Sequence, residues 1–365
     1  MTPLARTIAQ RIRLQGPITV AAFMAEALGH PRHGYYMAAD PLGRDGDFIT
    51  APEISQMFGE LIGLWCAETW RLMGAPSPFH LVELGPGRGT LMADALRAAK
   101  VLPGFNEAAL IHLVETSPPL RARQKAALEP RSATWHDDLG DVPSGPMILV
   151  ANEFFDALPI HQFERTAEGW RERLIAVSDD DRFILTPSRS RSPSEVLISE
   201  SLRDGAPAGT VAEVSPAAIS IMTAIVERLE RTGGAALLID YGYDAGPAGA
   251  TLQAVRRHRP HDFLDDPGSA DLTAHVDFAA LAAVARPHAA VFGPVGQGDF
   301  LCNLGIELRA RQLLGRASEA QKSAIEAAKR RLIDPDEMGT LFKALAVCDR
   351  GLAVPPGFEA AASTG

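Results

Sequence analysis

A glycine-rich segment from Glu83 to Thr90 combines an acid, three glycines and a hydroxyl group within eight residues. Its glycines are Gly85, Gly87 and Gly89, with Pro86 between the first two. Glycine tolerates positive φ angles and lets backbone N–H groups approach a ligand closely, because it has no Cβ. The apolar pattern around the segment predicts a strand over 79–84 and a helix over 91–100. A turn of this kind, at a helix N-terminus, can hold the anionic or polar end of a cofactor.

The spacing of these glycines selects between cofactors. A dinucleotide site of the GxGxxG type would need glycine at position 90, where this chain has Thr90. A GxGxG turn preceded by an acid resembles the first motif of class I S-adenosylmethionine (SAM) methyltransferases. The pattern therefore favours SAM over a nicotinamide cofactor, and both over a turn without a ligand. The residues predicted to bind the cofactor here are Glu83, Gly85, Pro86, Gly87, Gly89 and Thr90.

Strands and helices alternate along the middle of the chain, which predicts an α/β fold with a mostly parallel sheet. Further strands are predicted over 110–115, 133–135, 147–151 and 235–241. Each of them ends in polar residues. Because the carboxyl ends of parallel strands share one edge of the sheet, these polar groups are expected to lie near the glycine-rich turn.

Acids after the second and third strands are candidates for contacts to ribose and adenine. Glu115 follows Gly89 by 26 residues, close to the spacing at which an acid meets ribose hydroxyls. Its neighbour Thr116 is included in the predicted cofactor site. Asp138 and Leu139 could meet the adenine amino group and ring, with Asp137 as the competing acid. The alternative role for Glu115 is to cap the following helix.

Three polar residues follow the fourth strand. Asn152 is predicted to contact the cofactor, and Glu153 and Asp156 are the candidate catalytic residues. Both acids could instead cap the next helix, a role that suits Asp156 better than Glu153. Carboxylates at this edge of the sheet would face a cationic or nucleophilic substrate.

Residues 1–75 form a predicted helical and lid region ahead of the sheet. Polar and aromatic residues interrupt it before a helix start, where Pro52 and Glu53 suit the first turn. The alternative is a solvated loop that caps this helix. The candidate substrate and lid residues are Tyr35, Thr50, Pro52, Glu53 and Gln56, together with Tyr241 at the end of the fifth strand.

The catalytic domain is predicted to span 76–354, and an insertion at about 160–214 includes a β-hairpin over 163–177. Asp271 and Thr273 are plausible caps for a helix over 277–285. Residues 355–365 are predicted to be a tail.

Composition narrows the class of protein. The chain has 365 residues, 46% of them hydrophobic, and a net charge of −10. No apolar run reaches the roughly 20 residues that span a bilayer, so a membrane protein is not expected. The acidic balance argues against nucleic acid as a partner. The three cysteines show no metal-binding spacing, and no metal is predicted. A bacterial cytoplasmic protein fits best, although three arginines without acids over 4–16 resemble a presequence.

Several motifs resemble the MidA family, whose mitochondrial members assist assembly of respiratory complex I. They lie at 34–36, 46–60, 83–90, 152–159, 240–242, 271–278 and 338–343, and so span nearly the whole chain. Ala51 stands where many members have serine. The resemblance implies a class I methyltransferase fold with a Rossmann-like, mostly parallel seven-stranded sheet and with SAM as cofactor.

The resemblance also implies a reaction, which is methylation of a protein arginine on a quinone-module subunit of complex I. In a eukaryotic cell it implies the mitochondrial matrix. Two alternatives remain open: a methyltransferase acting on another nucleophile, and an assembly factor that binds SAM without chemistry. The motifs leave the oligomeric state unspecified.

Overall fold

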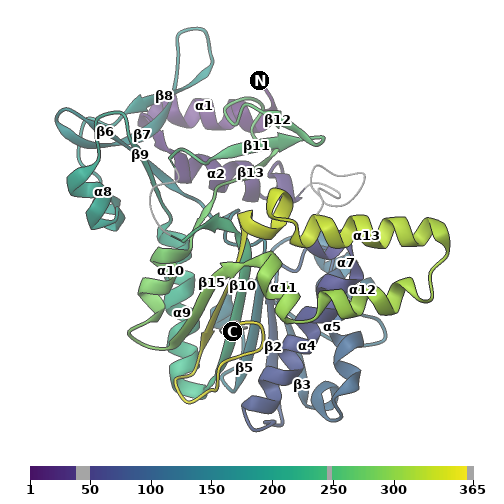
Figure 1. The fold of residues 1–365 in the computed structure, drawn as a ribbon. Coiled ribbons are helices and arrows are strands. Elements are labelled where there is room, and N and C mark those ends of the chain that lie inside the picture. Colours follow the sequence, from purple (N-terminus) through teal and green to yellow (C-terminus); the bar gives the residue numbers. More distant parts are fainter. Residues whose placement is uncertain (38–49, 245–248, 360–365) are drawn as a thin grey trace. The chain divides into compact units, whose positions relative to one another are not determined.

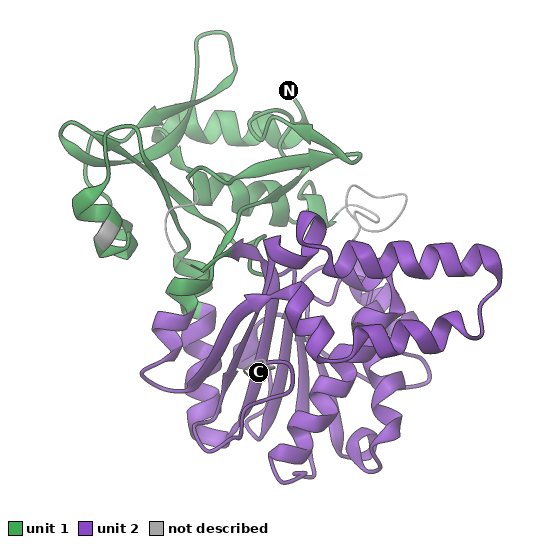
Figure 2. Cartoon of the chain, in the orientation of Figure 1, with its two compact units in different colours: residues 1–48, 155–220, 243–281 green, residues 49–154, 221–242, 282–365 purple. Residues whose placement is uncertain are grey.

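The computed structural model describes residues 1–37, 50–244 and 249–359. The chain divides into two compact units, each built from separate stretches of sequence (Figure 2). Unit 1 comprises 1–48, 155–220 and 243–281, and unit 2 comprises 49–154, 221–242 and 282–365. The domain boundaries predicted from the sequence, at about 75 and 354, stay a prediction.

The central sheet belongs to unit 2 (Figure 1). Among the described residues, seven strands follow one path in the order β15-β16-β10-β5-β2-β3-β4. All pairs from β10 to β4 are parallel, whereas β16 is antiparallel to both its neighbours. This is the predicted α/β, mostly parallel seven-stranded sheet. Strand order reverses between β2 and β5, which makes their carboxyl ends the expected ligand site.

Five strands of this sheet, β2, β3, β4, β5 and β10, lie close to the positions predicted above, and no strand was predicted at β15. The bounds of the strands are β2 Phe79–Leu84, β3 Ala109–Val114, β4 Thr134–His136, β5 Met147–Asn152, β10 Gly234–Tyr243, β15 Ala290–Gly296 and β16 Phe342–Cys348. β2 and β5 are buried along their whole length. This explains their continuous apolar runs, because strands covered on both faces do not alternate.

Helices connect these strands. They are α3 Ala51–Ile54, α4 Gln56–Leu72, α5 Thr90–Ala98, α6 Phe105–Ala108, α7 Pro118–Leu128, α9 Pro216–Thr232, α11 Gln297–Asn303, α12 Ile306–Leu314 and α13 Glu319–Ile333, with short helices η2 Ala99–Val101, η3 Leu139–Asp141 and η5 Pro335–Gly339. The helix expected from Pro52 onward is broken at Ser55, which is extended (φ −159°, ψ 135°). The Ser55 hydroxyl accepts a hydrogen bond from Met57 N (3.2 Å) and so starts α4 anew.

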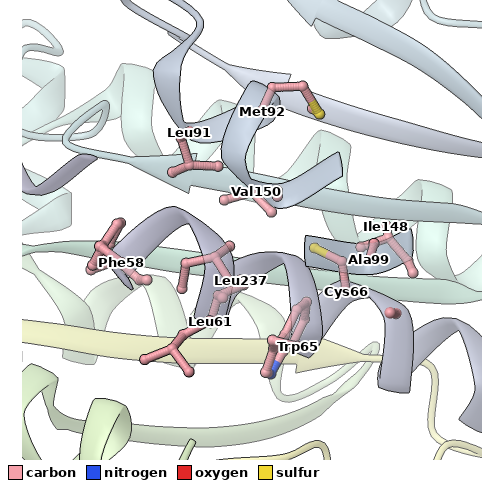
Figure 3. Close-up of a cluster of buried hydrophobic side chains, with 14 of the residues drawn as sticks. Phe58, Leu61, Trp65, Cys66, Leu91, Met92, Ala99, Ile148, Val150 and Leu237 are labelled. Carbon is pink, nitrogen blue, oxygen red and sulfur yellow. The ribbon is translucent and has the colours of Figure 1, made fainter. Parts of the chain in front are cut away.

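The core of unit 2 includes buried side chains of α4, α5, β5 and β10 (Figure 3). Phe58, Leu61 and Trp65 of α4 are at most 2% exposed. α4 lies so close to α5 that a Cβ on Gly63 would come within 2.4 Å of the Ala95 carbonyl oxygen. The absence of a side chain at Gly63 is therefore what permits this helix contact.

Unit 1 contains two smaller sheets. β1 Ile18–Thr19, β7 Gly169–Val177, β6 His161–Thr166 and β9 Val211–Val214 pair in that order, β8 Phe183–Pro187 adds to β7, and β11 Gln253–Arg256 pairs with β12 Arg259–His261 and β13 Asp271–Thr273. The antiparallel β6–β7 pair is the predicted hairpin. The other elements are α1 Pro3–Gln15, α2 Val20–Gly29, η1 Tyr35–Met37, η4 Pro193–Leu197, α8 Glu200–Gly205, β14 Val276–Asp277 and α10 Phe278–Ala285.

The predicted caps of the helix near 277 are wrong. Asp271 and Thr273 lie in β13, and the Asp277 carboxylate instead accepts a hydrogen bond from Ala280 N (2.9 Å). The sequence order D-L-T before the helix suggested capping, but pairing with β11 takes those residues into a strand.

Three histidines form a hydrogen-bonded row across the parallel strands of unit 2. His80 Nδ1 lies 2.9 Å from His112 Nε2, and His112 Nδ1 lies 2.9 Å from His136 Nε2. Each contact needs one donor and one acceptor nitrogen, so the row is satisfied when all three rings are neutral. Burial lowers the pKa of all three rings, and that of His112 falls to about 4.

This row predicts a pH dependence of stability. The unfolded chain takes up protons at histidine near pH 6.5, whereas the buried His112 resists protonation until about pH 4. The stabilisation is therefore present above pH 6.5 and is lost as pH falls from 6.5 towards 4. The slope approaches about 1.4 kcal/mol per pH unit for one proton. Urea unfolding of the wild type and of His112→Phe at several pH values measures it, and equal slopes in the two proteins would contradict it.

Candidate active site

The glycine-rich turn joins β2 to α5 at the carboxyl edge of the sheet. Gly85, Gly87 and Gly89 have φ angles of 58°, 52° and 84°, and Gly89 is the N-cap of α5. A Cβ on Gly85 would come within 2.8 Å of the Phe154 ring. Positive φ and this close contact together explain the glycine spacing. The turn presents backbone N–H groups at a helix N-terminus, as predicted.

Glu83 is buried at the end of β2, with 3% of its surface exposed. Burial raises the pKa of its carboxyl to about 8. Within the described part of the chain, its Oε2 has no hydrogen-bond partner. A buried acid in this state requires a polar neighbour that the described residues do not supply there.

Glu115 lies after β3, as predicted, and its two oxygens have different partners. Oε1 accepts a hydrogen bond from Ser117 N (2.8 Å), and Oε2 accepts one from Gln124 Nε2 (3.1 Å). The N-cap of α7 is Ser117 and not Glu115, and contact of Glu115 with a ribose stays a prediction, as it does for the exposed Thr116. Burial raises the pKa of the Glu115 carboxyl.

Gln124 of α7 was not predicted from the sequence. The Gln124 side chain is fully buried, and its Nε2 also donates a hydrogen bond to the Gly87 carbonyl oxygen (2.8 Å). Its Oε1 accepts one from Trp135 Nε1 (2.8 Å). Gln124 therefore joins the glycine-rich turn to Glu115 and β4. A lone amide in a helix of many charged residues gave no signal of this role.

Asn152 ends β5, and Glu153 follows it next to the glycine-rich turn. Glu153 has φ +49°, a left-handed conformation that is costly for a residue with a side chain. Its Oε1 accepts hydrogen bonds from Ala51 N (2.8 Å) and Asn152 Nδ2 (3.2 Å). The backbone thus holds a carboxylate in a strained, fixed position at the edge where ligands bind, which supports a functional role.

Buried Asp240 of β10 maintains the backbone after Glu153. Its carboxylate accepts hydrogen bonds from Phe154 N (3.1 Å) and Tyr241 N (3.0 Å). Tyr241 itself is 3% exposed and packs edge-on against Phe342 at a ring distance of 5.3 Å. Asp240 could have been noticed as an acid within an apolar strand, which is rarely buried without backbone partners.

Among the predicted lid residues at 50–56, one contacts the glycine-rich turn, and the other three lie at the starts of α3 and α4. Glu53 of α3 binds the glycine-rich turn, because its Oε1 accepts a hydrogen bond from Thr90 Oγ1 (2.5 Å) and its Oε2 lies 3.7 Å from Arg88 Nη1. Thr50 is the N-cap of α3, Pro52 is buried in its first turn, and Gln56 is exposed at the start of α4. Residues 46–49 of the same motif lie outside the described residues.

Comparison with known proteins identifies the family. Residues 61–295 match the family described as "Putative S-adenosyl-L-methionine-dependent methyltransferase". The chain belongs to this family. Relatives named "Protein arginine methyltransferase NDUFAF7, mitochondrial" are 42% identical in Mus musculus and 40% in Homo sapiens. The alignments cover 94% and 95% of this chain and 83% of each relative.

Solved structures agree with this family. A Burkholderia thailandensis protein bound to S-adenosyl-homocysteine has a TM-score of 0.84 and 28% identity, over 98% of this chain and 94% of its own. A native structure from the same organism gives 0.81 and 29%, over 97% and 93%. The chain is thus similar in fold to a protein that binds the product form of SAM, and the predicted MidA family, fold and cofactor are confirmed.

The carboxyl edge of this methyltransferase fits SAM. Within the described residues, Glu83 Oε2 and Asn152 Oδ1 are buried acceptors without a hydrogen-bond partner. SAM carries an ammonium group and hydroxyl groups that can donate to such acceptors, and the glycine-rich turn has no Cβ in the way.

No helix in the described ranges is long and apolar enough to span a membrane.

The segment predicted to hold adenine is fixed by its own contacts. Asp138 accepts a hydrogen bond from Gly140 N (2.7 Å) and starts η3, and Leu139 is buried. The competing acid Asp137 binds Arg121 (2.6 Å). Arg228 of α9 donates to the carbonyl oxygens of Leu139 (3.4 Å), Val142 (2.9 Å) and Pro143 (2.6 Å). Adenine contact by Asp138 and Leu139 stays a prediction.

Arg228 is therefore expected to position this segment of the methyltransferase. Arg228→Gln removes most of these hydrogen bonds, each worth about 1 kcal/mol, and should weaken SAM binding about tenfold. Calorimetric titration with SAM measures the affinity. Arg231→Gln is the matched control, because Arg231 donates within its own helix to Glu227 O (3.1 Å). Unchanged SAM affinity in Arg228→Gln would contradict the role.

Asp156 and Tyr35 belong to unit 1. Asp156 and Tyr35 are 5% and 4% exposed. The neighbouring Tyr36 hydroxyl donates a hydrogen bond to Asp271 Oδ1 (3.0 Å). Burial raises the pKa of Tyr36, and the charges of Asp271 and Asp156 raise it further. Tyr36, Asp156 and Asp271, from the predicted motifs at 34–36, 152–159 and 271–278, thus interact in unit 1. A catalytic role for Asp156 stays a prediction.

Proposed function

We propose that this methyltransferase transfers a methyl group from SAM to an arginine of a protein, a quinone-module subunit of complex I, and so supports assembly of that complex. The similarity to relatives named protein arginine methyltransferases supports the acceptor class. The observation that carries the proposal in this chain is the strained, anchored carboxylate of Glu153.

The chemistry of arginine explains why a fixed carboxylate is useful. A guanidinium stays protonated at neutral pH and is a poor nucleophile. A carboxylate can hold it by paired hydrogen bonds and orient one nitrogen towards the methyl group. SAM supplies a methyl group on a sulfonium, and alignment with the acceptor nitrogen accounts for most of what the protein must add. Glu153 suits this task, and Asp156 is the second candidate.

The proposed location follows from the same comparison. The relatives carry the word mitochondrial in their names, which supports the mitochondrial matrix if the chain is eukaryotic. In a bacterium the proposed compartment is the cytoplasm, where the quinone-module subunits would be methylated before or during assembly.

The test is a transfer assay with SAM labelled in its methyl group. The purified chain is incubated with isolated quinone-module subunits, and the product is hydrolysed to amino acids. Label in methylated arginine is the expected result. Label in another amino acid or only in a small molecule would indicate a methyltransferase with a different acceptor. SAM binding without any transfer would indicate a non-catalytic assembly factor.

A further inference from the structure

Unit 1 encloses a cavity of about 70 Å³. None of the site residues predicted from the sequence lines this cavity, although Phe155, the neighbour of Asp156, does. This volume is several times what one water molecule needs. Its walls come from Phe155, the end of β9, the first turns of α9, and β14 with α10. Most of the lining is apolar, and its polar side chains include Glu213, Tyr243 and Asp277. The cavity can therefore hold an extended apolar chain with one polar end.

Both acids in the wall are held in place by unit 1. Glu213 Oε1 accepts hydrogen bonds from Gln162 Nε2 (2.7 Å), Thr251 N (3.0 Å) and Leu252 N (3.1 Å). Asp277 caps α10 through Ala280 N (2.9 Å). Glu213 Oε2 also accepts a hydrogen bond from the Thr251 hydroxyl, and burial raises the pKa of Asp277. Neither carboxyl group can turn away from the cavity without losing these bonds, so both are fixed in position.

The wall supplies no matching positive charge. No lysine or arginine lines the cavity, and within the described residues neither Glu213 nor Asp277 forms an ion pair with one. Burial lowers the pKa of His275, the one histidine in the wall, which favours its neutral form. The pKa of Tyr243 is raised by burial and further by Asp277 and Glu213, which places both acids near its phenol. A cationic ligand would complete this set of charges.

We propose that this cavity binds an arginine side chain of the protein substrate, an inference that rests on the proposed function. The aliphatic part of arginine suits the apolar wall, and the guanidinium suits the two carboxylates. Arginine fits better than lysine, because a planar guanidinium also stacks on aromatic rings and the wall offers Phe155 and Tyr243. The cavity thus provides a subsite that selects arginine-containing segments.

The test does not involve SAM and uses agmatine as the probe, a four-carbon chain with a guanidinium at one end and an ammonium at the other. Binding to the whole chain is followed by NMR of the methyl groups of Ile160 and Ile219, which line the cavity. Asp277→Asn removes the charge but keeps the cap, because asparagine caps as well as aspartate. The variant should bind agmatine at least about tenfold more weakly.

Two further variants sharpen this test. Asp262→Asn is the matched control, because Asp262 is an acid of unit 1 that also accepts a backbone hydrogen bond, from Leu264 N (3.0 Å), away from the cavity. It should bind agmatine as the wild type does. Ala218→Leu fills the cavity and should abolish binding even if Asp277→Asn fails to fold. If agmatine changes none of these methyl chemical shifts, or changes them equally in all variants, the proposal is overturned.

The outcomes separate this subsite from the proposed function. Agmatine binding that depends on Asp277, without methyl transfer to any protein, would retain the cavity and reject the enzymatic role. Methyl transfer to arginine with no agmatine binding in the cavity would retain the enzymatic role and reject the subsite. If both hold, Asp277→Asn should raise KM for the protein substrate about tenfold and leave kcat nearly unchanged.

Discussion

Glu153→Gln is expected to lower kcat for methyl transfer by about 10²- to 10³-fold, the range found when one preorganised electrostatic contact is removed from an active site. Glutamine has the shape of glutamate and can still accept from Ala51 N, which the wild-type side chain does at 2.8 Å. The backbone geometry should therefore survive, and SAM affinity should stay within about threefold. The lost charge is what holds and stabilises a cationic acceptor.

Single-turnover transfer assays and calorimetric SAM binding measure the two quantities separately. Glu319→Gln provides the control, because Glu319 is an exposed acid of unit 2 that forms an ion pair with Lys322 of its own helix. Its kcat should match that of the wild type. If Glu153→Gln transfers methyl groups at the wild-type rate, Glu153 is not catalytic and Asp156 becomes the leading candidate.

Gly63→Ala is expected to lower the free energy of unfolding by about 1–3 kcal/mol, the usual cost of overpacking a core. The new methyl group would lie 2.4 Å from Ala95 O and 2.5 Å from Ala95 Cα. Backbone atoms of α5 cannot rotate away as a side chain can, so α4 and α5 must separate. Since α5 begins at the glycine-rich turn, SAM affinity should also fall.

Urea unfolding measures this effect, and Gly29→Ala is the matched control. Gly29 is also helical, at the end of α2, but a Cβ there has nothing within 4 Å. Alanine should be neutral or slightly stabilising at that position, because it has the higher helix propensity. Equal destabilisation by the two substitutions would show that the contact between α4 and α5 does not depend on Gly63.

The sequence predicted the parts of the site that depend on local patterns. The predicted strand over 79–84 coincides with β2, and the glycine spacing led to the turn and to SAM. These features follow from neighbouring residues alone, because a buried strand reads as a continuous apolar run and a turn needs glycine at defined positions.

Contacts between distant segments could not be predicted in this way. Gln124, Arg228 and Asp240 support the site through hydrogen bonds to the backbone of other elements. Gln124 and Arg228 are ordinary residues for a helix, and Asp240 is an unusual acid in an apolar strand, but nothing nearby marks the partners of any of the three. The break at Ser55 is not evident from the sequence for a different reason: Pro52 and Ser55 are both good helix starts, and either could begin one continuous helix.

The interleaved order of the two units has a consequence for synthesis on the ribosome. α1 and α2 are complete by residue 29, yet the strand β7 that they contact ends at Val177. At about 5–20 residues per second, their apolar faces wait on the order of ten seconds for that partner. Buried residues such as Phe23 and Met24 stay accessible to chaperones during that interval. The nascent chain is therefore most prone to aggregation while residues 49–154, the first stretch of unit 2, are being made.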